Sequence, residues 1–168
     1  TKIVTPQTLN STYQFIHQQI KQGYQIYFIC PLINESPKLQ TKSAIEEYQH
    51  LKKNIFPQYS IGLLHGQLKS QEKKSIMDKF YQGKISILVS TSVIEVGIDV
   101  ANATVIFISG AERFGLASLH QLRGRVGRGR AQSYCFLSTD KPNPKTVKRL
   151  QTLVQSNDGF YIAEADLK

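Results

Sequence analysis

The chain of 168 residues is long enough for one domain with its own core, and its 40% hydrophobic and 20% charged residues exclude a disordered chain. A formal net charge of +9 at pH 7 favours a polyanionic partner, such as nucleic acid or the phosphates of a nucleotide. The sequence shows no signal peptide and no apolar run of membrane-spanning length, so we expect a cytoplasmic protein without a membrane partner.

Apolar residues recur with two periods that alternate along the chain. Helical spacing, as at Leu9, Tyr13, Ile16 and Ile20, predicts helices over 5–22, 43–54, 70–82, 116–122 and 145–155. Short apolar runs predict strands over 25–30, 60–64, 85–90, 104–108 and 133–137. Ser70 is the expected N-cap of the third helix, and Gly83 follows its end.

Alternating strands and helices of this kind indicate an α/β fold, with a mostly parallel sheet covered by helices on both faces. Ligands of such sheets bind at the carboxyl ends of the strands. We expect three segments at this edge: His65–Gly66, Ser90–Thr91 and the arginine-rich segment after helix 116–122. His65 and Gly66 suit either a simple turn or a contact with nucleic acid.

The cysteines and histidines do not form the pattern of a disulfide or a metal site. Cys30 and Cys135 lie in apolar, strand-like runs, so we expect buried thiols. Metal-ligand spacing is absent among the four histidines, which are His17, His50, His65 and His120. We therefore predict no metal site formed by this chain alone.

Residues 121–130 read Gln-Leu-Arg-Gly-Arg-Val-Gly-Arg-Gly-Arg and hold four of the six arginines and three of the eleven glycines. Arginine offers a planar fork of donors that matches phosphate oxygens, and glycine lets the backbone turn tightly beside a ligand. The glycine spacing differs from the dinucleotide-binding fingerprint. The segment is either a solvated basic loop or a phosphate site, and the segments upstream of it in the sequence favour the phosphate site.

The chain lacks two parts that a complete nucleotide hydrolase of this class requires. A phosphate-cradling Gly-x-x-x-x-Gly-Lys-Ser/Thr loop is absent, and no acidic pair follows a strand as a magnesium site would require. We therefore expect the isolated chain to be inactive as an ATPase. Its arginines could instead reach a phosphate bound by another lobe, where an arginine finger contributes roughly a thousandfold or more to the rate.

The segment 91–99 follows the third predicted strand and carries small, polar residues. Thr91 and Ser92 offer hydroxyl and amide donors that suit a phosphate of a single strand. Gly97 permits close approach of a ligand, and Asp99 could accept hydrogen bonds from ribose hydroxyls or cap a turn.

Three segments, in this order, resemble conserved motifs of the second motor domain of superfamily 2 helicases. Residues 121–128 resemble motif VI, 91–99 resemble motif V, and 26–33 occupy the place of motif IV. The resemblance covers nearly the whole chain and implies a three-layer, RecA-like domain of the P-loop NTPase type. The stretch 111–128 is similar to two families of bacterial DNA translocases, RecG and the transcription-repair coupling factor, and the stretches 30–36 and 157–167 are similar to RecG.

This resemblance implies a role for each matched residue at the nucleotide. Arg125 and Arg128 would contact the γ-phosphate of ATP, with Arg128 as the preferred finger. Gln121 would position the nucleotide or the attacking water. Asp99 would touch the ribose, and Gly97 would lie at the interface between lobes. ATP and Mg²⁺ would be bound mainly by a first motor domain that this chain lacks.

The same resemblance implies that the whole protein is an ATP-dependent helicase or translocase in DNA recombination and repair. Its substrates would be branched DNA, such as replication forks and Holliday junctions. DNA contacts would come from Thr91, Ser92, His65, Gly66 and Arg123. The partners of this chain would be the P-loop motor domain and the wedge domain of the same polypeptide, because a start at Thr1 indicates a piece of a longer protein.

We expect residues 1–156 to form the helicase lobe, and 157–168 to begin an extension that couples ATP turnover to translocation. Two alternatives stay open from sequence. The chain could be the equivalent lobe of the transcription-repair coupling factor, which the tail 157–167 argues against. It could also be a stand-alone basic nucleic-acid-binding module, which predicts tight, strongly salt-dependent DNA binding by the chain alone.

Overall fold

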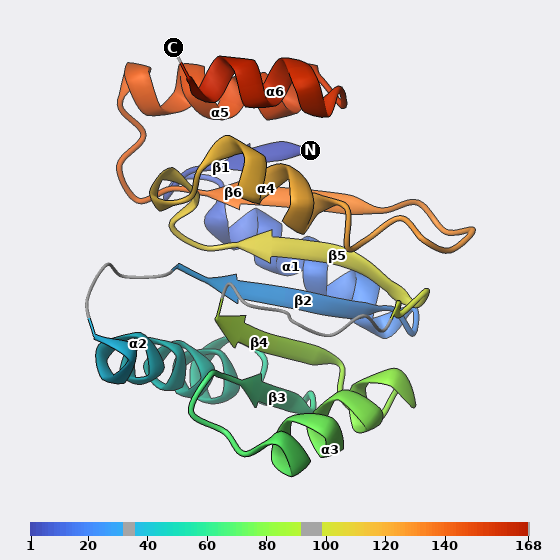
Figure 1. Ribbon diagram of the computed structural model, residues 1–168. Coiled ribbons are helices and arrows are strands. Elements are labelled where there is room, and N and C mark those ends of the chain that lie inside the picture. The colour runs from blue at the N-terminus through green and yellow to red at the C-terminus, as the bar shows by residue number, and fades with distance from the viewer. Residues whose placement is uncertain (32–35, 92–98, 168) are drawn as a thin grey trace.

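The computed structural model describes residues 1–31, 36–91 and 99–167. One six-stranded sheet runs through the centre of these residues in the order β1-β6-β5-β2-β4-β3 (Figure 1). Every pair of neighbouring strands is parallel. The strands are β1 (Lys2–Val4), β2 (Gln25–Cys30), β3 (Ile61–Leu64), β4 (Ile87–Thr91), β5 (Ala103–Ile108) and β6 (Tyr134–Ser138).

Six α-helices and two short helical turns, among the described residues, connect the strands. The helices are α1 (Leu9–Lys21), α2 (Pro37–His50), α3 (Ser70–Tyr81), α4 (Leu116–Arg123), α5 (Pro144–Gln155) and α6 (Gly159–Asp166). A π-helical turn, Leu51–Ile55, continues α2, and a 3₁₀ turn, Ala111–Arg113, precedes α4.

Side chains of the sheet alternate between two separate hydrophobic cores. On β2, Ile26 and Phe28 belong to the core shared with α1, α2 and the π-helical turn, whereas Tyr27 and Ile29 face the core shared with α3 to α6. Figure 1 shows α1 behind the sheet and α4 in front of it. The predicted three-layer α/β fold is therefore confirmed.

The sequence prediction missed some elements and misplaced several boundaries. It missed β1 and α6, and it placed the start of α2 too late, because Pro37 begins that helix. The prediction of Ser70 as an N-cap is wrong. Lys69 occupies that position, and its backbone N–H donates to the Glu72 carboxylate at 2.8 Å, so Ser70 is already helical.

The predicted polar segments lie at two opposite edges of the sheet and not at one. Thr91 ends β4 and His65 follows β3, so both lie at the carboxyl edge. The arginine-rich segment leads into Tyr134, the first residue of β6, and therefore lies at the amino edge (Figure 1). Our placement of this segment was wrong because α4 is a crossover helix, which returns the chain to the edge where parallel strands begin.

Candidate functional site

The arginine-rich segment is fixed at its start by the apolar side of α4. Leu116, Leu119 and Leu122 of this helix are buried against the sheet. Beyond the helix, Gly127 has a φ of +84°, a conformation that favours glycine. A Cβ atom at Gly127 would also lie 2.8 Å from Oγ of Ser133, so the turn depends on glycine for two reasons.

A second glycine brings the arginine-rich segment against the chain that enters β5. A Cβ atom at Gly129 would lie only 2.7 Å from the carbonyl oxygen of Ala101, which is closer than real Cβ contacts. Ala101 lies two residues after Asp99 in the sequence. The absence of a side chain at Gly129 therefore lets the arginines approach Asp99.

Arg128 and Asp99 form an ion pair at this contact. Nη1 of Arg128 donates to Oδ2 of Asp99 at 3.1 Å, and Nε donates to the carbonyl oxygen of Gly124 at 3.2 Å. The two side chains are 47% and 56% exposed, so both can reach a ligand from solvent.

Tyr27 of β2 lies near the same group of charges. Burial raises the pKa of its hydroxyl to about 12; the nearby charges of Arg125 and Arg128 act to lower this pKa, and the charge of Asp99 acts to raise it. The charge of Arg125, which is half-buried, therefore acts on the same hydroxyl as the charges of Arg128 and Asp99, and the shared role of these residues stays a prediction. Gln121 is exposed in the last turn of α4, before this group.

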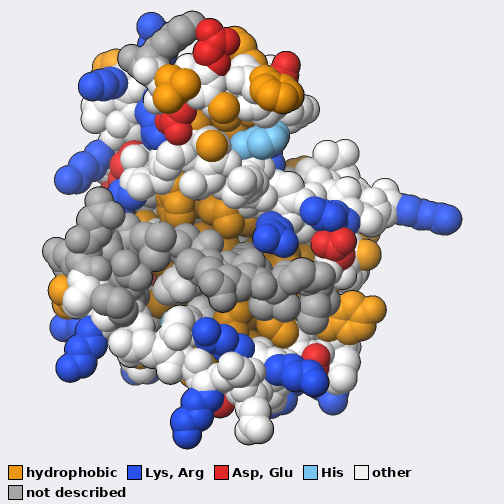
Figure 2. All heavy atoms as spheres, in the orientation of Figure 1, with side chains coloured by type: hydrophobic (Ala, Val, Ile, Leu, Met, Phe, Trp, Pro, Cys, Tyr) orange, Lys and Arg blue, Asp and Glu red, His pale blue; other side chains and the backbone are white. Residues whose placement is uncertain are grey.

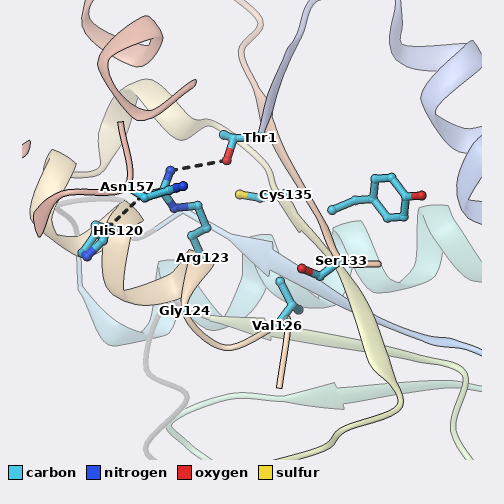
Figure 3. Close-up of a pocket in the computed structure, with 10 residues that line it drawn as sticks. Thr1, His120, Arg123, Gly124, Val126, Ser133, Cys135 and Asn157 are labelled. Atoms are coloured by element: carbon cyan, nitrogen blue, oxygen red, sulfur yellow. Dashed lines mark hydrogen bonds between the residues drawn. The ribbon is translucent and has the colours of Figure 1, made fainter. Parts of the chain in front are cut away.

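Arg123 points away from this group, into the protein. Its Nη1 donates to the carbonyl oxygen of Leu153 at 2.6 Å, and both Nη atoms donate to that of Ser156 at 3.1 Å. Nη2 also lies 2.9 Å from Nδ1 of His120, and burial lowers the pKa of the guanidinium. Figure 3 shows Arg123 between His120 and Thr1 in a cavity of about 400 Å³. Its predicted DNA contact stays a prediction, whereas its observed contacts join α4 to the end of α5.

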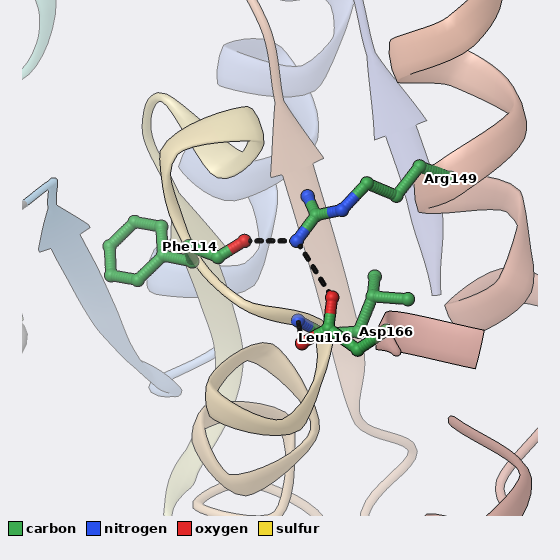
Figure 4. Close-up of polar contacts among 4 residues, drawn as sticks. All are labelled: Phe114, Leu116, Arg149 and Asp166. Carbon is green, nitrogen blue, oxygen red and sulfur yellow. Dashed lines mark hydrogen bonds and ion pairs between the residues drawn. The ribbon is translucent and has the colours of Figure 1, made fainter. Parts of the chain in front are cut away.

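A carboxylate from α6 caps the start of α4, a role that the sequence analysis missed. Oδ2 of Asp166 accepts a hydrogen bond from the backbone N–H of Leu116 at 2.9 Å, and Oδ1 accepts one from Arg149 at 3.2 Å (Figure 4). Arg149 also donates to the carbonyl oxygen of Phe114 at 2.6 Å. Asp158 caps α6 in turn by accepting from the next helical N–H groups. An Asp-Gly pair before a short apolar run was the available sequence signal for α6.

Three of the predicted DNA-contacting residues, Thr91, His65 and Gly66, lie at the carboxyl edge. Thr91 is buried at the end of β4, where it is in register with Cys30 of β2. His65 and Gly66 form the turn before α3, in which the backbone N–H of Gln67 lies 3.3 Å from Nδ1 of His65. Burial, and secondarily the charge of Lys73, lowers the pKa of His65. On the face of the molecule that Figure 2 shows, Lys and Arg side chains lie over α3 and below α4.

Several other predictions concern residues that the structure describes only in part. Ser92, Gly97 and the last two residues of the motif IV stretch, 32 and 33, lie outside the described residues. Cys30 and Cys135 are buried free thiols, as predicted, and burial raises the pKa of each to about 12. Over residues 1–31, 36–91 and 99–167, no cluster of His, Cys, Asp or Glu could hold a metal ion, and no helix could cross a membrane.

The fold and the arginine segment agree with one family of proteins. The helicase conserved C-terminal domain family matches residues 7–130, and the chain belongs to this family. Within it, the chain is 51% identical over 168 residues to the ATP-dependent DNA helicase RecG of Synechocystis sp., a match that covers 100% of this chain and 20% of that relative. RecG of Thermotoga maritima is 49% identical, with 100% and 22% covered. The predicted resemblance to RecG is therefore confirmed.

Solved structures also match the chain to RecG and to the helicase fold. A RecG bound to a three-way DNA junction superimposes with a TM-score of 0.82 at 46% identity, covering 99% of this chain and 21% of that one. Domain 2 of the DEAD-box helicase Mss116p, bound to an RNA duplex, gives a TM-score of 0.65 at 21% identity, covering 89% of this chain and 57% of that one. This similarity shows that the two domains share a fold. The chain spans about a fifth of the length of its RecG relatives.

Proposed function

We propose that this chain is the second motor lobe of an ATP-dependent DNA helicase that acts on branched DNA in recombination and repair. The observation that carries the proposal is the meeting of Asp99, Arg125 and Arg128 in a lobe whose sequence has no phosphate-binding loop. Such a group can complete a nucleotide site that another lobe begins. The RecG relatives, which are named ATP-dependent DNA helicases, support this interpretation.

In this proposal ATP lies between the amino edge of this lobe and the P-loop lobe of the same polypeptide. Arg128 and Arg125 stabilise the negative charge that develops on the transferred γ-phosphoryl group. Gln121 positions the attacking water, and Asp99 and Gly97 receive the ribose side of the nucleotide. Mg²⁺ is held by the other lobe in this proposal.

DNA lies along the carboxyl edge in this proposal, at Thr91, Ser92, His65 and Gly66. The solved RecG relative is bound to a three-way DNA junction, which supports branched DNA as the substrate. This chain spans about a fifth of the length of its relatives, which leaves room for a wedge domain as a further partner in the same polypeptide. Nucleotide and DNA then lie at opposite edges of one sheet, so small movements of the lobe that follow ATP turnover would shift the DNA edge directly. A cytoplasmic location is part of the same proposal.

The tail from residue 157 begins the segment that couples turnover to translocation. Arg123 links the end of α4 to the end of α5, and Asp166 links the start of α4 to α6. The helix that carries Gln121 and leads into Arg125 and Arg128 is thus held at both ends by the C-terminal elements. A displacement of the arginine-rich segment on ATP binding would therefore also move α5 and α6.

ATP hydrolysis on forked DNA tests the proposal. This 168-residue chain should not hydrolyse ATP, whereas the chain joined to its natural upstream segment should hydrolyse it. In the longer protein, Arg128→Ala should reduce turnover by roughly a thousandfold while DNA binding is kept. Arg130→Ala, in the same segment and also exposed to solvent, is the matched control and should stay active. Hydrolysis by the short chain, or full turnover by Arg128→Ala, would contradict the proposal.

A further inference from the structure

The strand β6 is paired over different lengths on its two sides. β5 pairs with β6 from Tyr134 to Leu137, whereas β1 pairs with it from Phe136 to Ser138. Opposite Tyr134 and Cys135, the described residues therefore place no strand on the β1 side. Backbone groups at such an edge remain available to a further stretch of chain.

The hydrogen bonds of β1 show how such a stretch would continue the ladder. The N–H of Thr139 donates to the carbonyl oxygen of Val4 at 3.0 Å, so every second residue along β6 turns its N–H and carbonyl groups towards β1. Cys135 and Ser133 belong to this series. The residue immediately before Thr1 would accept from the N–H of Cys135 and donate to the carbonyl oxygen of Ser133.

A cavity of about 400 Å³ lies beside the start of β1. Its walls include Thr1, Ser133 and Tyr134, together with Gly124 and Gly127 of the arginine-rich segment (Figure 3). The two glycines have no side chains to fill this space, and protein interiors contain few voids larger than a water molecule. The cavity therefore has room for further residues of a polypeptide.

The charge of Arg123 does not make this cavity an anion site. Its Nη1 donates to the carbonyl oxygens of Leu153 and Ser156 and to Oγ1 of Thr1. Its Nη2 donates to the same Ser156 oxygen and lies 2.9 Å from Nδ1 of His120. These contacts use the N–H groups of both Nη atoms. An anion would have to displace them, whereas an uncharged backbone would not.

We propose that the cavity holds the stretch of polypeptide that immediately precedes Thr1, and that this stretch lengthens β1 along β6. The inference rests on the proposed function, in which a P-loop lobe upstream is joined to this lobe. The connection between the two lobes is then seated against Gly127, in the turn that leads into Arg128.

The register of β1 places each residue of this connecting stretch. Thr1 lies opposite Cys135, the residue before it lies opposite Tyr134, and the next residue upstream lies opposite Ser133. Side chains of a strand alternate between the two faces of the sheet. The residue opposite Ser133 therefore points to the same face as Thr1, which is the face that carries α4 and the cavity.

Thiol labelling of the full-length enzyme tests whether the cavity is occupied. Ser133→Cys places a thiol in the cavity wall, and Gln132→Cys, at the exposed neighbouring position, is the matched control. The two native cysteines are buried. N-ethylmaleimide should react more slowly with Ser133→Cys than with Gln132→Cys, because the connecting stretch covers position 133.

Two proline substitutions in the Ser133→Cys enzyme test the predicted ladder. A proline immediately before Thr1 removes the N–H that donates to Ser133. Loss of one backbone hydrogen bond corresponds to a factor of roughly 2 to 13 in an equilibrium constant, so labelling should become faster by about that factor. Thr1→Pro is the matched control, because the N–H of Thr1 points away from β6, and it should leave the labelling rate unchanged.

Three outcomes would overturn the inference. The first is equal labelling of Ser133→Cys and Gln132→Cys in the full-length enzyme. The second is protection that survives the proline before Thr1, since another surface, such as the P-loop lobe, would then cover the cavity. The third is an equal response to both prolines. Labelling does not depend on ATP turnover, so these outcomes are distinct from failure of the proposed function, which Arg128→Ala tests. Unchanged DNA binding by each variant verifies that it folds.

Discussion

Asp166→Ala should destabilise the lobe, because this side chain caps a helix that has no cap of its own. Gly115 occupies the N-cap position of α4 and offers no side-chain acceptor. Asp166, 50 positions further along the chain from Leu116, provides that acceptor at 2.9 Å. The same carboxylate pairs with Arg149, and the side chains of Arg149 and Asp166 are 33% and 27% exposed.

The expected loss of stability can be estimated from these contacts. Removing a helix-capping acceptor costs about 1 kcal/mol. Removing a negative charge from a helix N-terminus costs about 0.3–1 kcal/mol, and a partly exposed ion pair adds about 0.2–1 kcal/mol after solvent screening. These effects overlap because they share one carboxylate, so we expect about 2 kcal/mol in total. For a domain of this size, that lowers Tm by roughly 4–8 °C.

Urea unfolding of the 168-residue chain, followed by circular dichroism, would measure this loss. Asp166→Asn keeps an oxygen acceptor for Leu116 but loses the charge, so its destabilisation should lie about halfway. Asp140→Ala is the control and should stay within about 0.5 kcal/mol of the unchanged chain. If Asp166→Ala also stayed within that range, the cap that α6 provides would have no energetic importance and the reasoning would be refuted.

Three further predictions follow from buried or crowded groups. Gln25→Ala should cost about 2–3 kcal/mol in urea unfolding, because its amide donates to two backbone carbonyls at 2.6 and 2.8 Å that would then lose this donor. Gly129→Ala should lower ATP turnover of the full-length enzyme severalfold, because its Cβ would lie 2.7 Å from the backbone carbonyl oxygen of Ala101 and would push the arginine-rich segment away from Asp99. Unchanged turnover would contradict this prediction. Burial raises the pKa of Cys30 and Cys135 to about 12, so few of these thiols are ionised at pH 8. The folded chain should therefore react with a maleimide at pH 8 roughly a thousandfold more slowly than the urea-unfolded chain. The reaction rate of the folded chain should rise with pH.

The alternation of elements and the core were predictable from sequence because they depend on local spacing. The prediction for β2 matches the structure, and that for β5 differs by one residue. β1 was missed because three residues are too few to show a period, and its pairing partner is more than 130 positions away. α6 was missed because it has no apolar stripe, with Ile162 buried but Phe160 and Tyr161 exposed.

The site was predictable in its residue types but not in its geometry. Arg123 and Arg125 are two positions apart in the same motif, and sequence alone gives both the same chemistry. Arg123 is the last residue of α4, whereas Arg125 lies beyond the C-cap residue Gly124, so helical spacing does not set the direction of both guanidinium groups. One enters the protein and bonds to α5, whereas the other faces the charges near Asp99. The tail that receives Arg123 could not be placed without tertiary contacts.

The pairing of β1 with β6 has a consequence for the order in which the lobe is made. Lys2 pairs with Phe136, so β1 of this lobe can join the sheet only after β6 has been synthesised. At about 5–20 residues per second, that interval is roughly 7–27 s, followed by a few seconds more before Asp166 can cap α4. Until β6 is added, the free edge of β5 is open to other strands, and contacts between positions as distant as β1 and β6 form slowly. The newly synthesised lobe is therefore most prone to misassembly just before β1 pairs with β6.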